Sequence, residues 1–200
     1  MIRKIILVFA FALISQLIAG CVDCNCQPSK TIYFTKKGLL LKNMDASLPQ
    51  PMVSNAGIIT SANYGIQIQF LIENLVSRKQ QVKWGLMQSA YACSCVEDTF
   101  LPKEDILSVE IFSNNDFDST HPKNTDLSLY FKVKRYATTI PIADYIKSLK
   151  DLNSLAGNAF YDGVFLQVAP SINKKHKFKV RVALSDGRVL EAETIEVELS

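Results

Sequence analysis

Apolar and polar residues alternate with a period of two along much of this chain, and that pattern predicts β-strands. The clearest run has Ile66, Ile68, Phe70 and Ile72 at every second position. Because successive side chains of a strand point to opposite faces, such a run gives one buried and one exposed face. A similar run is broken near Gly38. In all, the pattern predicts strands over residues 32–41, 66–72, 109–111, 164–169, 178–184 and 188–199.

The last two of these strands are joined by Ser185-Asp186-Gly187, a sequence typical of a β-hairpin turn. A two-residue loop would place Val182 opposite Glu191, so we favour a three-residue loop with Gly187 in the left-handed conformation. Further along the last strand, the apolar residues move from even-numbered to odd-numbered positions, which predicts a bulge or twist near Thr194. The expected register pairs Leu184 with Leu190, Val182 with Ala192, and Arg181 with Glu193.

One segment has the helical period instead, and it lies between Pro141, tolerated in a first turn, and Gly157. Its apolar stripe is Ile142, Tyr145, Ile146, Leu149 and Leu152.

Many short strands and a single helix predict a mainly β fold, namely an antiparallel β-sandwich of the immunoglobulin-like type with one inserted short helix. We expect the lone Trp84 to pack in its core. Residues 44–63 lack periodicity, and a connection of that length is typically functional or mobile.

The first twenty residues follow another pattern. Arg3 and Lys4 precede an apolar run over residues 5–14, and small residues stand just before Cys21. This arrangement is typical of an export signal. A membrane-spanning anchor is the alternative, but it needs about 20 apolar residues. Ser15 and Gln16 interrupt the run too early for that.

Ile18-Ala19-Gly20-Cys21 resembles, position for position, the lipobox of bacterial lipoproteins. The resemblance implies cleavage before Cys21, lipidation of Cys21 with acyl chains such as palmitate, and a membrane anchor. Val22 stands where aspartate marks inner-membrane retention in that class, so the resemblance implies the outer membrane. The expected organisation is a lipoprotein signal peptide over residues 1–20, a tether over 21–30 and a single β-sandwich domain over 31–200.

Removal of the signal makes the protein nearly neutral. Loss of Arg3 and Lys4 lowers the number of Lys and Arg residues from 22 to 20, against 19 Asp and Glu, which leaves a net charge of +1. We therefore expect no nucleic-acid partner. The length suits one domain.

Four further cysteines form two Cys-x-Cys pairs. Exported proteins use even numbers of cysteines as disulfides, so we predict bridges. Bonding across the two pairs would close loops of roughly 70 residues, worth ~4 kcal/mol in the chain-entropy model. A four-thiolate metal site and free thiols are the alternatives, although structural zinc sites prefer wider spacings. The residues concerned are Cys24, Cys26, Cys93 and Cys95.

The polar stretch 113–126 is the one segment with possible ligand chemistry. Asp116, Asp118 and Thr120 alternate like the first ligands of a calcium loop. A helix-flanked calcium loop also needs glycine at its sixth position and glutamate at its twelfth, and neither is present. We therefore favour a strand-ending loop whose Asn and Asp side chains bond their own backbone. We therefore predict no metal site. In the alternative of a metal-binding loop, Asp116 and Asp118 are the candidate ligands.

Tyr91-Ala92-Cys93-Ser94-Cys95 and the run from Asp116-Phe117-Asp118 to His121-Pro122 resemble an uncharacterised group of bacterial lipoproteins of about 200 residues. Members carry a cysteine-containing segment, a strand, and then an Asp-Phe-Asp to His-Pro loop. This chain has Lys123-Asn124 where we would expect Ala-Gly, so the loop matches in part. The resemblance implies no activity.

The histidines give no catalytic arrangement. We interpret His121 as a loop residue and His176, within a basic run that discourages strand pairing, as a solvated strand-edge residue. A nucleophilic triad needs a base oriented by a third group, and no Gly-x-Ser-x-Gly elbow accompanies either histidine. We predict no catalytic residues and no cofactor.

Anchor, strands and loops together predict a non-catalytic binding or accessory module of the cell envelope. Its expected partners are the membrane, through the lipid, and an envelope protein or glycan. A structural or assembly component of an outer-membrane complex is the second hypothesis. A hydrolase is the third hypothesis, because the distance between two catalytic carboxylates is set by the fold and cannot be inferred from their spacing in the sequence.

Overall fold

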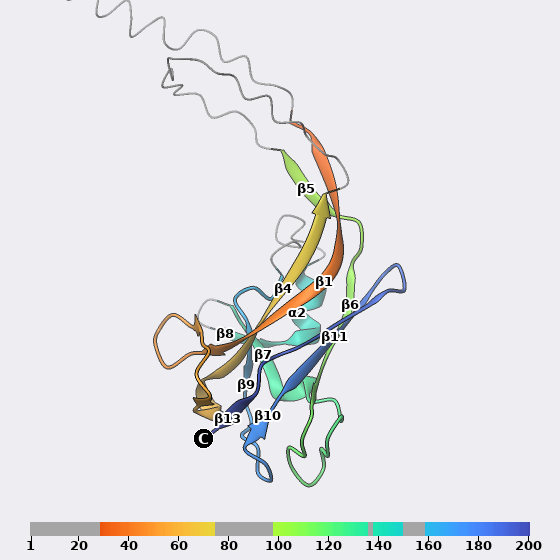
Figure 1. The fold of residues 1–200 in the computed structure, drawn as a ribbon. Coiled ribbons are helices and arrows are strands. Elements are labelled where there is room, and N and C mark those ends of the chain that lie inside the picture. The colour runs from red at the N-terminus through yellow and green to blue at the C-terminus, as the bar shows by residue number, and fades with distance from the viewer. Residues whose placement is uncertain (1–28, 75–97, 136–137, 150–158) are drawn as a thin grey trace, which may run out of the picture. The chain divides into compact units, whose positions relative to one another are not determined.

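The computed structural model describes residues 29–74, 98–135, 138–149 and 159–200 (Figure 1). The chain divides into two compact units, of which the first comprises Met1–Thr31 and Ser77–Thr99 and the second Ile32–Val76 and Phe100–Ser200. In the first unit, the backbone N–H of Lys30 donates to Asp98 Oδ1 at 3.0 Å. The second unit contains nearly all of the described strands and helices.

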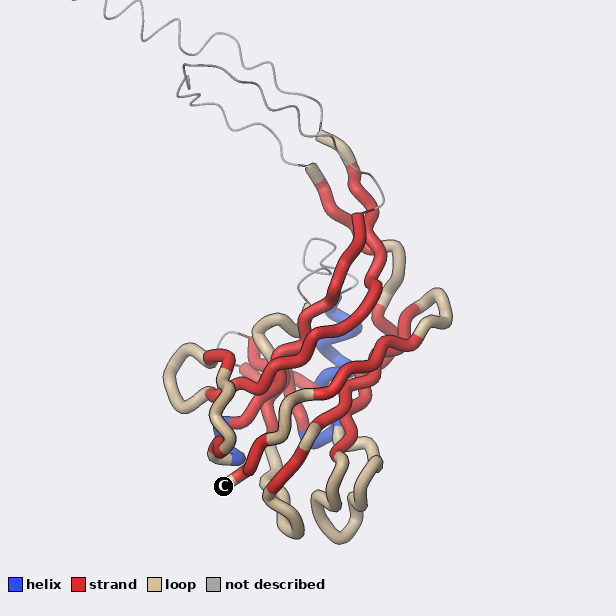
Figure 2. The backbone as a smooth tube through the Cα atoms, viewed as in Figure 1, coloured by secondary structure: helices blue, strands red, loops and turns tan. Residues whose placement is uncertain are grey.

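Strands make up most of the described backbone, as Figure 2 shows, and the fold is mainly β with one α-helix, as predicted. In chain order, the elements are β1 (Thr31–Asp45), β2 (Met52–Val53), β3 (Ile58–Ile59), the 3-10 turn η1 (Ser61–Asn63), β4 (Tyr64–Asn74), β5 (Thr99–Pro102), β6 (Ile106–Ser113), the 3-10 turn η2 (Ser128–Tyr130), β7 (Phe131–Arg135), β8 (Thr138–Pro141), α2 (Ile142–Leu149), β9 (Val164–Leu166), β10 (Lys175–His176), β11 (Phe178–Leu184), β12 (Val189–Glu193) and β13 (Val197–Leu199).

Within the described residues, the strands form one large sheet and two small ones. The large sheet has seven strands in the order β2-β1-β4-β9-β7-β8, with β5 beside β1. The small sheets have the orders β12-β11-β6 and β10-β13-β3. The pairings of β1 with β4 and of β11 with both neighbours are antiparallel, whereas β13 pairs with β3 in parallel. The predicted break near Gly38 is confirmed, because the β1–β4 register shifts between Lys36 and Gly38.

The large sheet and the β12-β11-β6 sheet pack on one apolar core. Ile66 and Ile68 of β4 belong to the same buried cluster as Ile111 of β6 and Val180 of β11. Phe178 of β11 contributes to the same cluster and is fully buried. Its ring stacks on Tyr64 at 5.3 Å and meets Phe131 edge-on at 5.7 Å. Burial of each such side chain contributes about 1.5–3 kcal/mol. This core holds the two sheets face to face.

The hairpin between β11 and β12 has the predicted three-residue loop, with Gly187 at φ +85°. The predicted register is wrong by two residues. Leu184 and Arg188 close the loop themselves, since the Leu184 N–H donates to the Arg188 carbonyl at 2.9 Å. The ladder therefore starts beside the turn, and its pairs are Val182 with Leu190, Arg181 with Glu191, and Val180 with Ala192.

The parity change near Thr194 corresponds to a change of sheet. β12 pairs with β11, whereas β13 pairs with β10 and β3. Thr194 is buried at the crossing, where its N–H donates to the Phe178 carbonyl at 2.8 Å and its Oγ1 accepts from the Phe178 N–H at 3.0 Å. The side chain thus replaces the ladder bond that the departing strand would have made.

The predicted helix is present as α2, which follows Pro141 directly and buries Ile142, Ile146 and Leu149. It packs against β6, β7 and β8. Leu152 and Gly157 lie outside the described residues. No helix in the described ranges has the length and apolar character needed to cross a bilayer.

The segment 44–63 is ordered by short elements rather than left as one open connection. It contains the end of β1, the strands β2 and β3, and η1. The Ser54 N–H donates to the Asn43 carbonyl and the Ala46 N–H to the Asn63 carbonyl, each at 2.8 Å. These bonds tie the segment back to β1 and to the start of β4.

Candidate functional site

The polar loop after β6 is anchored to the core by Phe117. This side chain is fully buried, and its ring lies 5.7 Å from the ring of Tyr130 and 5.4 Å from that of His176. Its carbonyl accepts the N–H of Ser171 at 2.9 Å, and its own N–H donates to the His121 carbonyl at 2.9 Å. An apolar residue in the middle of a polar stretch therefore fixes the loop from below.

Asp118 is the hydrogen-bonding centre of the loop. Its carboxylate accepts the backbone N–H groups of Thr120 and His121, each at 2.8 Å, and the Thr120 hydroxyl at 2.7 Å. It also accepts from His121 Nδ1 at 2.9 Å and from the Tyr130 hydroxyl at 3.1 Å. Five donors saturate a group with about four lone-pair sites. The predicted bonding of acidic side chains to their own backbone is thus present.

These contacts set the charge state of the cluster. Partial burial raises the pKa of Asp118, but the hydrogen bonds from Thr120 and His121 outweigh it and hold the pKa well below its usual range. Partial burial, together with the Asp118 carboxylate, raises the pKa of Tyr130. At neutral pH the cluster is therefore a carboxylate anion held by a neutral phenol.

His121 is oriented by this anion. With Nδ1 directed at Asp118, the second ring nitrogen, Nε2, has no hydrogen-bond partner among the described residues. His121 and Asp118 together have the arrangement of the base and the orienting carboxylate of a nucleophilic triad. In the part of the chain that the structure describes, no serine, threonine or cysteine is bonded to Nε2 as the third member would be.

The candidate metal ligands Asp116 and Asp118 both bind within the loop. Asp116 Oδ1 accepts the Lys123 N–H at 2.8 Å, and a cation at Asp118 would have to displace the donors described above. Among the residues described, no group of three or more His, Cys, Asp or Glu side chains is placed to hold a metal ion.

His176 was predicted as a solvated residue, and this prediction is wrong. It is fully buried, and its ring stacks on Phe178 at 5.5 Å. Nε2 donates to the Asn173 carbonyl at 2.7 Å, so Nδ1 accepts from the Ser113 hydroxyl at 2.7 Å. Both nitrogens are thus satisfied in the neutral ring. Burial lowers the pKa of His176, and the bond to Asn173 offsets this in part.

The free energy of unfolding is expected to fall as the pH drops below ~6.5, because the unfolded chain then binds a proton that the buried His176 resists. The slope has an upper limit of about 1.4 kcal/mol per pH unit. Urea titrations between about pH 7.5 and 5.5 measure it. The variant His176→Asn should flatten the slope. An unchanged slope in His176→Asn would refute this assignment.

A second buried polar cluster joins β1 to the hairpin. Glu104 Oε1 accepts the Thr35 hydroxyl at 2.5 Å and lies 2.9 Å from Arg188 Nη2. The Lys36 ammonium donates to the Glu104 carbonyl at 2.8 Å, and burial lowers the pKa of Lys36 against the opposing charges of Glu104 and Asp105. The charged groups of Lys36, Glu104 and Arg188 thus each have a hydrogen-bond or ion-pair partner within the cluster. These contacts join β1, the connection between β5 and β6, and the β11–β12 hairpin.

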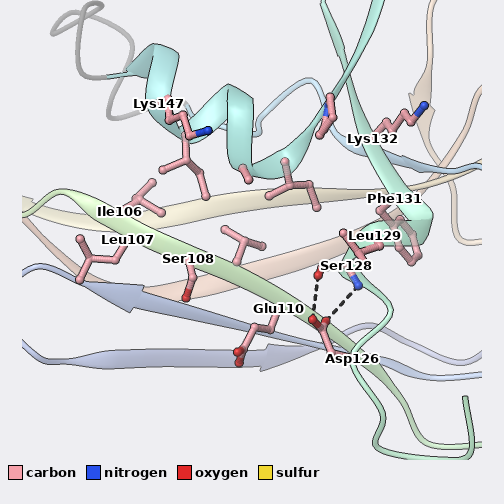
Figure 3. A pocket seen from close by; sticks show the side chains of 15 residues that line it. Ile106, Leu107, Ser108, Glu110, Asp126, Ser128, Leu129, Phe131, Lys132 and Lys147 are labelled. Carbon is pink, nitrogen blue, oxygen red and sulfur yellow. Dashed lines mark hydrogen bonds between the residues drawn. The ribbon is translucent and has the colours of Figure 1, made fainter.

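A groove lies between helix α2 and strand β6, and we call it the α2–β6 groove (Figure 3). Its volume is about 530 Å³, within the usual range for ligand sites. Ile106 points from β6 toward the helix, as Figure 3 shows. The apolar part of the lining consists of Ile106, Leu107 and Val109 of β6, Leu129 of η2, Phe131 of β7, Pro141 of β8, and Ile142, Ala143 and Ile146 of α2. The polar part consists of Ser108, Glu110, Asp126, Ser128, Lys132 and Lys147.

The polar loop positions one end of this groove. Tyr130, held by Asp118, is the last residue of η2, and the preceding residue, Leu129, is 89% exposed at the groove. Asp126 fixes the start of the same turn, because its carboxylate accepts the Ser128 N–H at 2.9 Å and hydroxyl at 2.8 Å. The Asp118 cluster therefore holds a large apolar side chain in solvent.

Sequence reasoning did not find this groove. Its residues come from five elements, β6, η2, β7, β8 and α2, which lie in three separate stretches of the chain. Only its exposure distinguishes Leu129 from an ordinary core leucine such as Leu127. The other predicted site residues lie outside the described residues: Cys21, Cys24, Cys26, Cys93, Cys95 and the lone Trp84.

Comparison with protein families gives a match. The model of a domain of unknown function (DUF5034) matches residues 36–195, a range that includes the polar loop and the α2–β6 groove. No curated protein and no solved structure matches the chain.

Proposed function

Since the chain belongs to the DUF5034 family, whose function is not defined, we propose from its own residues that it is a lipid-anchored envelope protein that binds a partner protein in the α2–β6 groove. The observation that carries this proposal is the groove itself. Leu129 and Leu107, which are 89% and 58% exposed, both line it, so exposed apolar side chains gather at the groove instead of being scattered singly. Covering them with a partner would remove this apolar surface from water.

The chemistry of the lining favours a protein over a glycan. The lining contains the polar residues Ser108, Glu110, Asp126, Ser128, Lys132 and Lys147 beside its aliphatic side chains. Its aromatic side chain, Phe131, is fully buried, so among the described residues the groove has no exposed ring on which a sugar could stack. The aliphatic part of the lining suits an apolar side chain of a protein. The exposed Leu107 and Leu129 are suited to contact it.

The anchor rests on the lipobox at Ile18 to Cys21. We propose that the mature protein starts at a lipidated Cys21 and is held at the outer membrane. Cys24, Cys26, Cys93 and Cys95 stay predicted as disulfide partners in that oxidising compartment.

Replacing Leu129 by aspartate is expected to weaken partner binding at least about tenfold in Kd, because a carboxylate cannot enter an aliphatic groove without losing its hydration. The partner is first purified with the mature protein from envelope extract and identified, and its affinity is then measured with both components pure. Leu48→Asp is the matched control, since Leu48 is 57% exposed and does not line the groove. Equal affinities for both variants would reject the groove as the binding site.

A further inference from the structure

We propose that the occupant of the α2–β6 groove is an extended peptide segment that adds a strand to the free edge of β6; this inference rests on the proposed binding function. β6 is an edge strand of the sheet β12-β11-β6. Among the described residues its ladder pairs with β11 alone, apart from an isolated bridge between Phe112 and Asp126. An edge strand leaves a row of N–H and C=O groups that can pair with another chain.

The direction of these groups follows from the bonds that β6 already makes. The Ile111 N–H donates to Asp126 Oδ1 at 3.2 Å, and the Ile111 carbonyl accepts the Leu127 N–H at 2.7 Å. The Ser113 carbonyl accepts from Asn124 at 2.8 Å. Ile111 and Ser113 of β6 thus direct backbone N–H or C=O groups away from β11, and these groups are hydrogen-bonded by residues of the polar loop.

Val109 is the next residue in this series. Its N–H and C=O point to the same edge, and among the described residues they have no partner. Leu107 precedes it at the register shift opposite Ala183 and Leu184, and its side chain is 58% exposed at the groove. The loop therefore continues the edge as far as Ile111, and the edge is open from there toward Ile106.

The two edges of this sheet are protected to different degrees. The β12 edge carries Glu191 and Glu193, which pair with Arg181 and Lys177. Charged side chains of this kind discourage the addition of a further strand. The segment Ile106-Leu107-Ser108-Val109 on the β6 edge has no charge and no proline, and the charge of Glu110, which follows it, is paired with Arg181 of β11. The sheet thus leaves open the edge that borders the groove.

An extended segment fits both features. Its backbone would bond Val109, while every second side chain would point between Ile106 and Ile146. The proposed ligand is therefore a peptide of about five residues with apolar side chains at alternate positions, because the stretch from Ile106 to Glu110 spans about 17 Å at ~3.4 Å per residue. Helix α2 forms the opposite wall.

The test uses the full mature protein, purified in mild detergent, and a phage-displayed library of random seven-residue peptides. The selected peptide is synthesised with N-methyl groups on alternate residues in each of the two phases. One phase should lose at least about tenfold in affinity and the other less than about twofold, because N-methylation removes a donor only where the strand faces β6. Equal losses in both phases, or no peptide binding tighter than about 1 mM, would overturn the proposal.

A pair of surface variants locates the contact. Leu107→Lys should weaken the selected peptide at least about tenfold, whereas Val189→Lys, on the other edge of the same sheet at a residue 52% exposed, should not. If the purified protein is a dimer that Leu107→Lys dissociates, the edge pairs with a second copy and the peptide proposal fails. If Leu129→Asp weakens the natural partner while neither N-methyl phase matters, the groove binds and the strand-addition proposal alone fails.

Discussion

Replacing Cys21 by alanine is expected to abolish the incorporation of palmitate into the protein. The proposed lipobox would direct acyl chains to this cysteine, and each buried methylene contributes ~0.8 kcal/mol to membrane binding. Two or more chains make the anchoring stable, whereas loss of the cysteine removes all of them. The measurement is cell fractionation with metabolic palmitate labelling, followed by the intact mass of the mature protein.

Cys24→Ala is the matched control, because it removes a cysteine only three residues away without touching the lipobox. This variant should remain in the membrane and keep its label. A wild-type protein that starts with methionine and carries no lipid would contradict the proposed anchor, as would a Cys21→Ala variant that still incorporates palmitate.

Replacing Phe117 by alanine is expected to lower the free energy of unfolding by about 3–5 kcal/mol. The fully buried ring packs between Tyr130 and His176, so its removal leaves a cavity under the polar loop. The same change should loosen η2 and weaken partner binding through Leu129. Urea denaturation measures the first effect, and the affinity of the purified partner measures the second.

Phe112→Ala is the control of the same residue type. Phe112 is half-buried, and Lys179 and Arg181 lie over its ring at 5.5 and 5.2 Å. Its loss should cost about 1 kcal/mol or less and leave binding unchanged. If the two variants have equal stability, Phe117 is not the anchor of the loop.

The strands were predictable because period-two alternation is local. The predicted strand at 178–184 has the bounds of β11, and the stripe from Ile142 correctly predicts α2. His176 was missed because lysines surround it, although it shares the parity of Phe178 and Val180, the buried positions of β11. Continuing the alternation through the basic run would have placed it in the core.

The groove was not predictable from the sequence, because the order of strands in a sheet decides which strand lies at the edge and which elements lie beside it. Nothing in Ile106-Leu107-Ser108-Val109 tells a central strand from an edge strand. The hairpin register failed for a smaller reason, since the loop length was right but the closing pair is Leu184 with Arg188. Local patterns thus specify elements, and long-range pairing specifies the site.

The most direct test of the account is photo-crosslinking in cells that make the full-length, anchored protein. A photoreactive residue is placed at Leu129 or Leu107 in the groove, or at Leu48 outside it. We expect a discrete partner adduct in the membrane fraction from both groove positions and none from Leu48. Adducts from Leu48 alone, or equal adducts from all three positions, would contradict this expectation.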